Sequence, residues 1–207
     1  MRIRPVSPAA LVEDVAARIA HRPGWVRVAV DGADASYPAE LADALVPPLR
    51  VAGREAFRVL VEDQLRPASL RYERGRTDPD SFYDDWLDAA GLVREVLDPL
   101  GPHGSGDIRP VRWDVATDRA SRYGFVPVPH GGVVIVSGPL LLGRGLPFDL
   151  TVHLDLSPGA LRRRTPADLA WTLPAYARYT DEVDPNSLAD IVVRVDDPRH
   201  PALVDRS

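Results

Sequence analysis

Five carboxylates in this sequence lie where acid/base chemistry would be possible. They are Asp31, Asp34, Glu62, Asp63 and Asp114. The first four directly follow apolar runs that are typical of buried strands, and the carboxyl ends of parallel strands meet at one edge of a sheet. Crowded carboxylates oppose each other's ionisation, which raises one pKa towards neutrality and suits that group to general acid/base work. We interpret Glu62 and Asp114 as the catalytic candidates. The alternative to a reactive cluster is that Asp31 and Asp34 cap the turn and Asp63 is solvated.

A second group of residues could bind a ligand rather than react with it. The segment 66–85 is polar and aromatic, and segments of that length inside a compact domain are usually functional or mobile. Arginines beside aromatic side chains can clamp an anionic or enolic group, although salt bridges are their commoner use. The expected substrate-binding residues are Asp34, Tyr37, Arg66, Tyr72, Arg76 and Arg109.

The turn between residues 31 and 39 has the frame of a phosphate-binding loop without its chemistry. Such a loop reads G-x-x-x-x-G-K-[ST], the Walker A pattern, in which backbone N–H groups surround a phosphate and the Lys and hydroxyl reach the phosphates and Mg²⁺. Gly32 supplies the first position, but Tyr37, Pro38 and Ala39 stand where the second Gly, the Lys and the Ser/Thr belong. Tyr37 is expected either to fill the vacated phosphate cavity or to stack on a ligand.

Composition narrows the functional classes further. The chain has 207 residues and a net charge of −5, and all 25 of its basic residues are Arg. No run of them is long enough to follow a nucleic-acid backbone, so DNA and RNA are excluded as expected partners. The absence of Lys excludes Schiff-base catalysis and any replacement of the missing phosphate-binding Lys by another Lys.

Other residue types that would supply chemistry are missing or dispersed. Without Cys there can be no disulfide, thiolate nucleophile or zinc–thiolate site, and the five His lack metal-ligand spacing. We therefore expect no metal and no cofactor. No apolar run approaches the ~20 residues of a membrane span, and the N-terminus lacks the apolar core of a signal peptide, so we expect a cytoplasmic protein with no membrane partner.

Strands alternating with helices predict a three-layer α/β domain that occupies residues 1–207 as one unit. A helix is expected from Ser7 to about His21, because Leu11, Val15 and Ile19 share one face. The five expected strands, which would form a mainly parallel sheet, are 25–30, 56–61, 131–138, 148–155 and 189–195.

Over nearly its whole length the sequence resembles the uridine-kinase-like P-loop kinases common in actinobacteria. The segments that carry the resemblance include Val28-Ala-Val-Asp-Gly32, Leu70-Arg-Tyr-Glu-Arg-Gly-Arg76, Trp113-Asp114, Val134-Ile-Val-Ser-Gly138 and Ala189-Asp-Ile-Val-Val193. The resemblance implies the P-loop fold and, with intact motifs, transfer of the ATP γ-phosphoryl to a nucleoside hydroxyl. It also places Glu62 at the family's carboxylate after the second strand, and Ser137 where relatives carry an acidic residue that helps to hold the metal.

Phosphoryl transfer consists almost entirely of positioning and charge neutralisation. Each lost charge-stabilising contact costs roughly 3–4 kcal/mol, so the missing Lys and metal contacts argue against kinase activity, while the ligand-binding segment is retained. We expect a kinase-fold protein that binds a small metabolite, in specialised biosynthesis for example, and performs cofactor-free cyclisation, dehydration or hydrolysis. The alternatives are a non-catalytic pseudokinase subunit and a residual uridine or nucleoside kinase that uses Arg; a homodimer is left open.

Overall fold

Seven strands form the central sheet in the computed structural model, which describes residues 2–205. Their spatial order is β1-β11-β10-β9-β2-β8-β3. The strands are β1 (Arg2–Pro5), β2 (Val26–Asp31), β3 (Ala56–Leu60), β8 (Val133–Gly138), β9 (Leu150–Asp155), β10 (Ile191–Arg194) and β11 (Ala202–Asp205). The five expected strands are all present and form the parallel part, β10-β9-β2-β8-β3.

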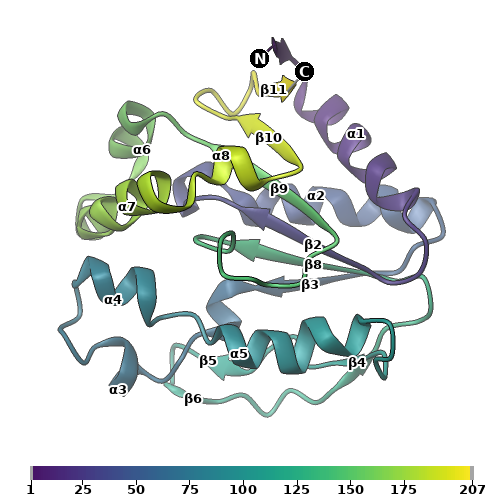
Figure 1. Cartoon of the computed structure of the whole chain (residues 1–207), viewed down its shortest axis with the longest axis horizontal. Helices are drawn as coiled ribbons and strands as arrows, with labels where there is room; N and C mark the ends of the chain where they lie inside the picture. The colour runs from purple at the N-terminus through teal and green to yellow at the C-terminus, as the bar shows by residue number, and fades with distance from the viewer. Residues whose placement is uncertain (1, 206–207) are drawn as a thin grey trace.

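The expected count of five strands is wrong by two. Strand β11 pairs antiparallel with β10, and β1 pairs antiparallel with β11. Each added strand has only four residues, and the two strands that pair lie near opposite ends of the sequence. A local sequence pattern cannot show such a pairing. The two ends of the chain consequently lie together at one end of the sheet (Figure 1).

Helices cover both faces of the sheet, which gives the expected three layers (Figure 1). They are α1 (Pro8–Ala20), α2 (Pro38–Val51), α3 (Ala68–Arg71), α4 (Pro79–Asp84), α5 (Ala89–Leu92), α6 (Pro158–Arg164), α7 (Leu173–Val183) and α8 (Pro185–Leu188). Helix α1 begins as predicted, because the Ser7 side chain accepts a hydrogen bond from Ala10 N at 3.1 Å.

Alternation along the strands divides the core in two. Val28 and Val30 of β2 pack in the cluster that contains α1 and α2, whereas Ala29 packs in the cluster on the opposite face. This is the two-residue period of a strand whose two faces are both covered. Helices α4, α6 and α7 gather beyond the carboxyl ends of the parallel strands, on the left of Figure 1. The loop after β2 opens at that edge.

The remaining elements connect this framework. Short 3-10 turns lie at η1 (Asp34–Ser36), η2 (Val61–Gln64), η4 (Asp98–Leu100) and η5 (Ala167–Thr172), and α5 continues into a π turn, η3 (Val93–Leu97). Two small hairpin pairs are β4 (Asp107–Ile108) with β7 (Val126–Pro127) and β5 (Trp113–Asp114) with β6 (Arg119–Ala120). No helix within residues 2–205 is both long and apolar enough to cross a bilayer.

Candidate functional site

The loop between β2 and α2 occupies the place of a phosphate-binding turn. It begins at Gly32, where a Cβ atom would collide with Oγ of Ser36. After the turn η1, Tyr37 adopts the left-handed conformation with a φ of 62°, and α2 starts at Pro38. That conformation costs a residue with a Cβ atom about 1–3 kcal/mol and is freely available to glycine. The loop therefore keeps a backbone shape suited to the glycine that Tyr37 replaces.

Backbone amides that a phosphate would need are already bonded within this loop. Ser36 N donates to Ala33 O at 2.7 Å, and Tyr37 N donates to Asp34 O at 3.0 Å. The Ser36 hydroxyl also donates to Ala33 O, at 2.6 Å. Loops of this kind bind phosphate through free N–H groups that converge on the anion. An anion would have to displace these internal bonds before it could be held.

The side chain of Tyr37 does not fill the phosphate position. Its residue is 46% exposed, and it lines an outer apolar groove together with Leu11, Leu41 and Pro201. It is not among the residues around the cavity beside Gly32. The ring therefore does not plug the cavity beside Gly32. Its other expected role, stacking on a ligand, stays a prediction.

The residues present do not fit the Mg²⁺ ion that accompanies ATP in the kinases that this sequence resembles. Ala39 has no hydroxyl, and the hydroxyl of Ser137 is 2% exposed and accepts a hydrogen bond from Arg58 at 3.2 Å. Across residues 2–205 no group of three or more histidine and carboxylate side chains is arranged to hold a metal ion. The loop thus lacks both the cation and the metal ligands of phosphoryl transfer.

Acidic side chains do converge beside the loop, as the sequence predicts. Shielding of its carboxyl group from water and the negative charges of Glu62 and Glu40 raise the pKa of Asp34 to about 6. Shielding, with the charges of Glu62 and Asp114, likewise raises the pKa of Asp63. Asp34 nevertheless has solvent-exposed surface, so it can exchange protons with water or with a ligand. Glu62 is common to both effects, because its charge raises the pKa of Asp34 and that of Asp63.

Asp114 is placed less favourably for catalysis than the sequence suggests. Its carboxylate accepts hydrogen bonds from Ala116 N at 3.0 Å and Thr117 N at 3.2 Å, in the turn that joins β5 to β6. Hydrogen bonds from the side chain and backbone of Thr117 lower its pKa. Asp114 is therefore a turn-capping carboxylate that stays ionised, which favours Asp34 over Asp114 as the partner of Glu62.

Three of the expected ligand-binding residues lie around a buried arginine. Arg71 is 2% exposed and donates to Arg66 O at 2.7 Å and to the Tyr72 hydroxyl at 3.1 Å. Its guanidinium lies 4.8 Å from the ring centre of Tyr72 and 5.2 Å from that of Trp86. The exposed Arg76 stacks on Tyr72 at 5.3 Å. Arg71 thus fixes the segment that carries Arg66, Tyr72 and Arg76.

Arg109 does not join this group. It donates to Ser121 O at 2.6 Å and to Tyr123 O at 3.2 Å, and it forms an ion pair with Glu95 at 3.7 Å. These partners belong to η3 and to the segment between β6 and β7. Arg109 therefore holds that segment in place, which is the commoner use of a surface arginine.

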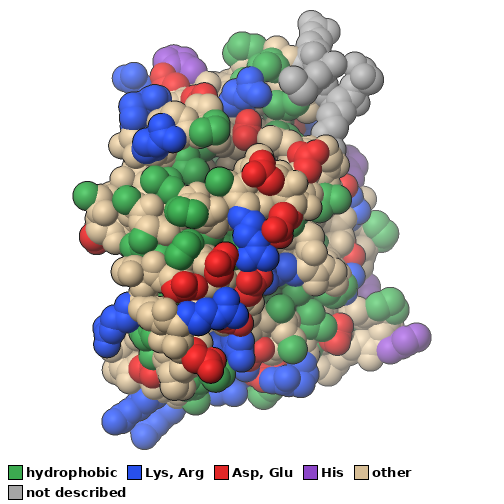
Figure 2. Space-filling view, turned by 60° about the vertical axis from the view of Figure 1, so that its left-hand side comes forward, with side chains coloured by type: hydrophobic (Ala, Val, Ile, Leu, Met, Phe, Trp, Pro, Cys, Tyr) green, Lys and Arg blue, Asp and Glu red, His purple; other side chains and the backbone are tan. Residues whose placement is uncertain are grey.

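Helix α7 is tied to α4 by a second arginine. Arg178 forms ion pairs with Asp80 at 3.3 Å and Asp84 at 3.0 Å, and its guanidinium lies 4.1 Å from the ring centre of Tyr83. Acidic and arginine side chains are intermixed on this side of the molecule, as Figure 2 shows. Opposite charges here face each other, so this surface is a set of ion pairs rather than a field of one sign.

Asp31 differs from its expected place at the rim, because it is completely buried. One carboxylate oxygen accepts from Leu141 N at 2.8 Å; the other lies 2.6 Å from Nδ1 of His153 and accepts from the Tyr179 hydroxyl at 3.1 Å. Burial, followed by the charge of Asp31, raises the pKa of Tyr179, so that its hydroxyl remains a donor. Sequence reasoning did not single out His153 or Tyr179. His153 is a polar position in the alternating strand β9, Leu150-Thr-Val-His-Leu-Asp155, and that pattern does not reveal its partner Asp31.

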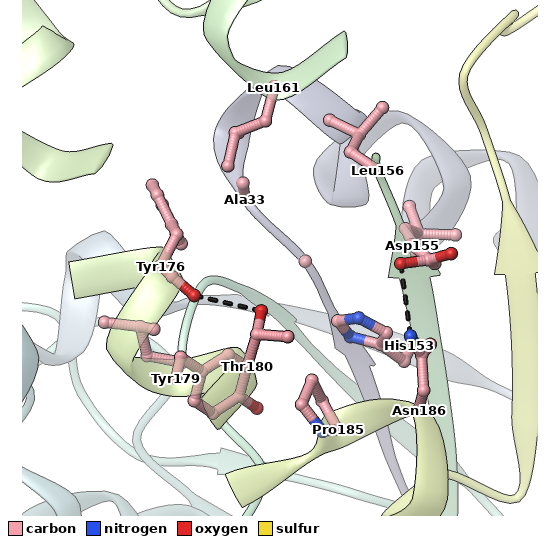
Figure 3. A pocket seen from close by; sticks show the side chains of 13 residues that line it. Ala33, His153, Asp155, Leu156, Leu161, Tyr176, Tyr179, Thr180, Pro185 and Asn186 are labelled. Carbon is pink, nitrogen blue, oxygen red and sulfur yellow. Dashed lines mark hydrogen bonds between the residues drawn. The ribbon is translucent and has the colours of Figure 1, made fainter. Parts of the chain in front are cut away.

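His153 borders a cavity at the carboxyl ends of β2 and β9. The inner part has a volume of about 50 Å³ and reaches from Gly32 to Asn186. It adjoins an outer part of about 580 Å³ beneath α6 and α7, and the two share walls formed by Asp155, Leu161 and Tyr176. Figure 3 shows His153 with Tyr179 and Thr180 on one side and Asn186 on the other. Neither Asp34 nor Glu62 lines either part.

Comparison with known proteins identifies the scaffold. No protein-family model and no curated protein sequence matches the chain. A possible uridine kinase from Bacillus stearothermophilus superposes with a TM-score of 0.69 at 20% identity, over 87% of this chain and 96% of that one. A candidate fructose transport system kinase from Silicibacter sp. TM1040 superposes with a TM-score of 0.61 at 22% identity, over 86% and 95% respectively. This chain therefore has the fold of the P-loop kinases, as its resemblance to uridine-kinase-like proteins predicts.

Proposed function

We propose that this protein binds a small metabolite on a kinase scaffold without using ATP, and that Asp34 and Glu62 perform acid/base chemistry on it. The observation that carries the proposal is the internal bonding of Ser36 N and Tyr37 N in the loop after β2. Together with Pro38, which has no N–H, and the absence of Lys, it removes the donors on which a triphosphate depends.

Electrostatics beside the loop also oppose a nucleotide tail. The carboxylates of Glu62 and Glu40 are each close enough to Asp34 to raise its pKa. A polyphosphate placed there would meet like charges without a compensating metal. Arg144 cannot easily replace the missing Lys, because it donates to the carbonyls of Leu140 and Tyr83.

The same crowding supports acid/base chemistry. A general acid or base works best when its pKa is near the working pH, and the pKa of Asp34 at about 6 meets that condition. The charge of Glu62 contributes to that shift, so a second carboxylate acts on Asp34. Such a pair serves proton transfer in a cyclisation, dehydration or hydrolysis.

Variants of these carboxylates test the proposal. The purified protein is incubated with metabolite pools, and depletion of a substrate and appearance of a product are followed by mass spectrometry. We expect turnover to fall by roughly 10²–10⁴-fold in Asp34→Asn and in Glu62→Gln, while Asp114→Asn, the matched control, retains it. Unchanged turnover in the first two variants would overturn the assignment of roles.

A non-catalytic binding subunit is the second candidate. The contacts that favour it are those between α4 and α7, where Arg178 and the ring pair Phe82 and Tyr176, 5.8 Å apart, hold the two helices together. Helices α4 and α7, held together in this way, could bind a ligand without having to close over it. This candidate predicts saturable ligand binding in the same screen with no product.

A further inference from the structure

Two polar atoms in the cavity between β9 and α7 have no protein partner that accounts for them. They are Nε2 of His153 and Oδ1 of Asn186, and both residues line the inner cavity. Among the described residues none forms a hydrogen bond with His153 Nε2, and Oδ1 of Asn186 is buried without a partner. A buried polar atom without a partner costs about 1–3 kcal/mol. Oδ1 of Asn186 is such an atom, and Nε2 of His153, beside the same cavity, also has no protein partner among the described residues. Together they indicate a ligand that satisfies them.

The protonation of the histidine ring follows from Asp31. An ionised carboxylate only accepts hydrogen bonds, and it lies 2.6 Å from Nδ1 of His153, so Nδ1 carries the proton. An imidazole whose single proton is on Nδ1 presents Nε2 as an acceptor. The Tyr179 hydroxyl and Leu141 N donate to the same carboxylate, which fixes the orientation of the ring.

The orientation of the Asn186 amide is fixed in the same way. Its Nδ2 donates to a carboxylate oxygen of Asp155 at 3.2 Å, and the reversed amide would place two acceptors against each other. Oδ1 is therefore the atom left unpaired. The cavity presents two acceptors, so its ligand must bring donors.

Charge in the cavity argues against an anion or a strong cation. Asp155, the acid common to both parts, is neutralised by Arg194 at 3.4 Å and is also bonded to Asn186. The outer part is lined by Arg162 and Arg194 and by the acids Asp155, Asp181 and Asp196, so the two signs partly balance. Apolar walls from Leu156, Leu161 and Leu173 complete it.

We propose that this cavity is a binding site for a neutral, hydroxyl-bearing small molecule of the polyol class, whose hydroxyls donate to His153 Nε2 and Asn186 Oδ1. An inner volume of about 50 Å³ admits one hydroxymethyl-sized group, and the outer 580 Å³ holds the rest of a small ligand. The site is separate from Asp34 and Glu62, which line neither part, so it does not depend on the acid/base proposal.

The test uses the ¹⁵N-labelled full chain. Long-range ¹H–¹⁵N spectra report the state of each histidine nitrogen, and the His153 signals are assigned by their loss in His153→Gln. Glycerol, D-ribose and myo-inositol are the probes, with inorganic phosphate as the anionic comparison. We expect the free protein to show an unprotonated Nε2 for His153, and at least one polyol to shift that signal saturably.

Variants on the opposite wall keep the test independent of Asp31 and its partners. Asn186→Leu removes the second acceptor without replacing Asp31 or His153, and should weaken the polyol about tenfold or more. Asp14→Asn, in α1 and in the lining of neither part, is the control and should change the affinity less than about threefold. The inference is overturned if no polyol shifts the His153 signal, if phosphate shifts it more strongly, or if Asn186→Leu binds as tightly as the unaltered protein.

Discussion

The carboxylate of Asp31 lies 2.6 Å from Nδ1 of His153, and the two residues are direct neighbours on the parallel strands β2 and β9. Asp31 ends the strand that leads into the loop at Gly32, whereas His153 lines the cavity beneath α7. Because Gly32 and Ala33 line the same cavity, this pair lies where the loop and the cavity meet.

Removing the Asp31 carboxylate should destabilise the protein strongly. Asp31→Ala would leave His153 Nδ1, the Tyr179 hydroxyl and Leu141 N without their acceptor in the core. We expect a loss of about 2–4 kcal/mol in the free energy of unfolding, measured by urea denaturation. Asp14→Ala, which removes an exposed pairing with Arg18, serves as the control and should cost about 0.5 kcal/mol or less. Equal costs for the two variants would contradict the role of Asp31.

Stability should depend on pH through Asp34. Its pKa is raised to about 6 in the folded protein from an ordinary value of 3.8, so the folded state binds more protons than the unfolded state between these values. Stability contributed by protonated Asp34 is therefore present at low pH and lost as the pH rises through about 6. Asp34→Asn should stabilise the protein at about pH 8, by no more than about 1 kcal/mol because water screens exposed charges, and should have no effect near pH 3.5. Melting curves at the two pH values test this, and a benefit confined to low pH would refute it.

Arg71 and Arg76 offer a matched pair of arginines in one segment. Arg71→Ala removes a buried guanidinium with two hydrogen bonds and two aromatic contacts, and should cost about 2–4 kcal/mol. Arg76→Ala removes only an exposed stacking contact with Tyr72 and should cost about 1 kcal/mol or less. Chemical denaturation followed by tryptophan fluorescence compares them. A larger loss in Arg76→Ala would show that Arg71 does not anchor the segment.

Arg178 should control local rather than global opening. Arg178→Ala breaks the ion pairs to Asp80 and Asp84, and we expect faster amide hydrogen exchange over residues 79–84. The free energy of global unfolding should change by about 1 kcal/mol or less, because these are exposed pairs. High salt should produce part of the same effect in the unaltered protein. If amide hydrogen exchange in α4 is unchanged, the aromatic contacts alone hold this helix in place.

Much of the fold could be predicted from the sequence because the inner strands are apolar on both faces. Runs such as 25–30 and 131–138 have no solvent face, and this identifies them as parallel strands whatever the rest of the chain does. Strands β1 and β11 escaped prediction because each has only four residues and its partner lies at the other end of the chain.

Prediction of the site was less complete, for a different reason. Placement of Asp34, Glu62 and Asp63 at one edge followed from strand ends alone, and their mutual charge effects agree with it. The partners of a side chain could not be predicted in that way: Asp31 is bonded inside the core, Asp114 caps a turn, and Arg109 holds a neighbouring segment. Each of these outcomes depends on contacts between residues distant in the sequence or on the local shape of a turn.

We propose that the loop from Gly32 to Ala39 does not hold a nucleoside triphosphate. A nucleoside kinase that used Arg in place of Lys would bind Mg²⁺–ATP at this loop, and a ligand at 100 times its Kd would stabilise the protein by about 2.7 kcal/mol. Isothermal titration calorimetry of the full chain with Mg²⁺–ATP, supported by melting curves, measures this most directly. We expect no heat of binding and no shift in Tm. Saturable, Mg²⁺-dependent binding that is lost on mutation of the loop would contradict the proposal.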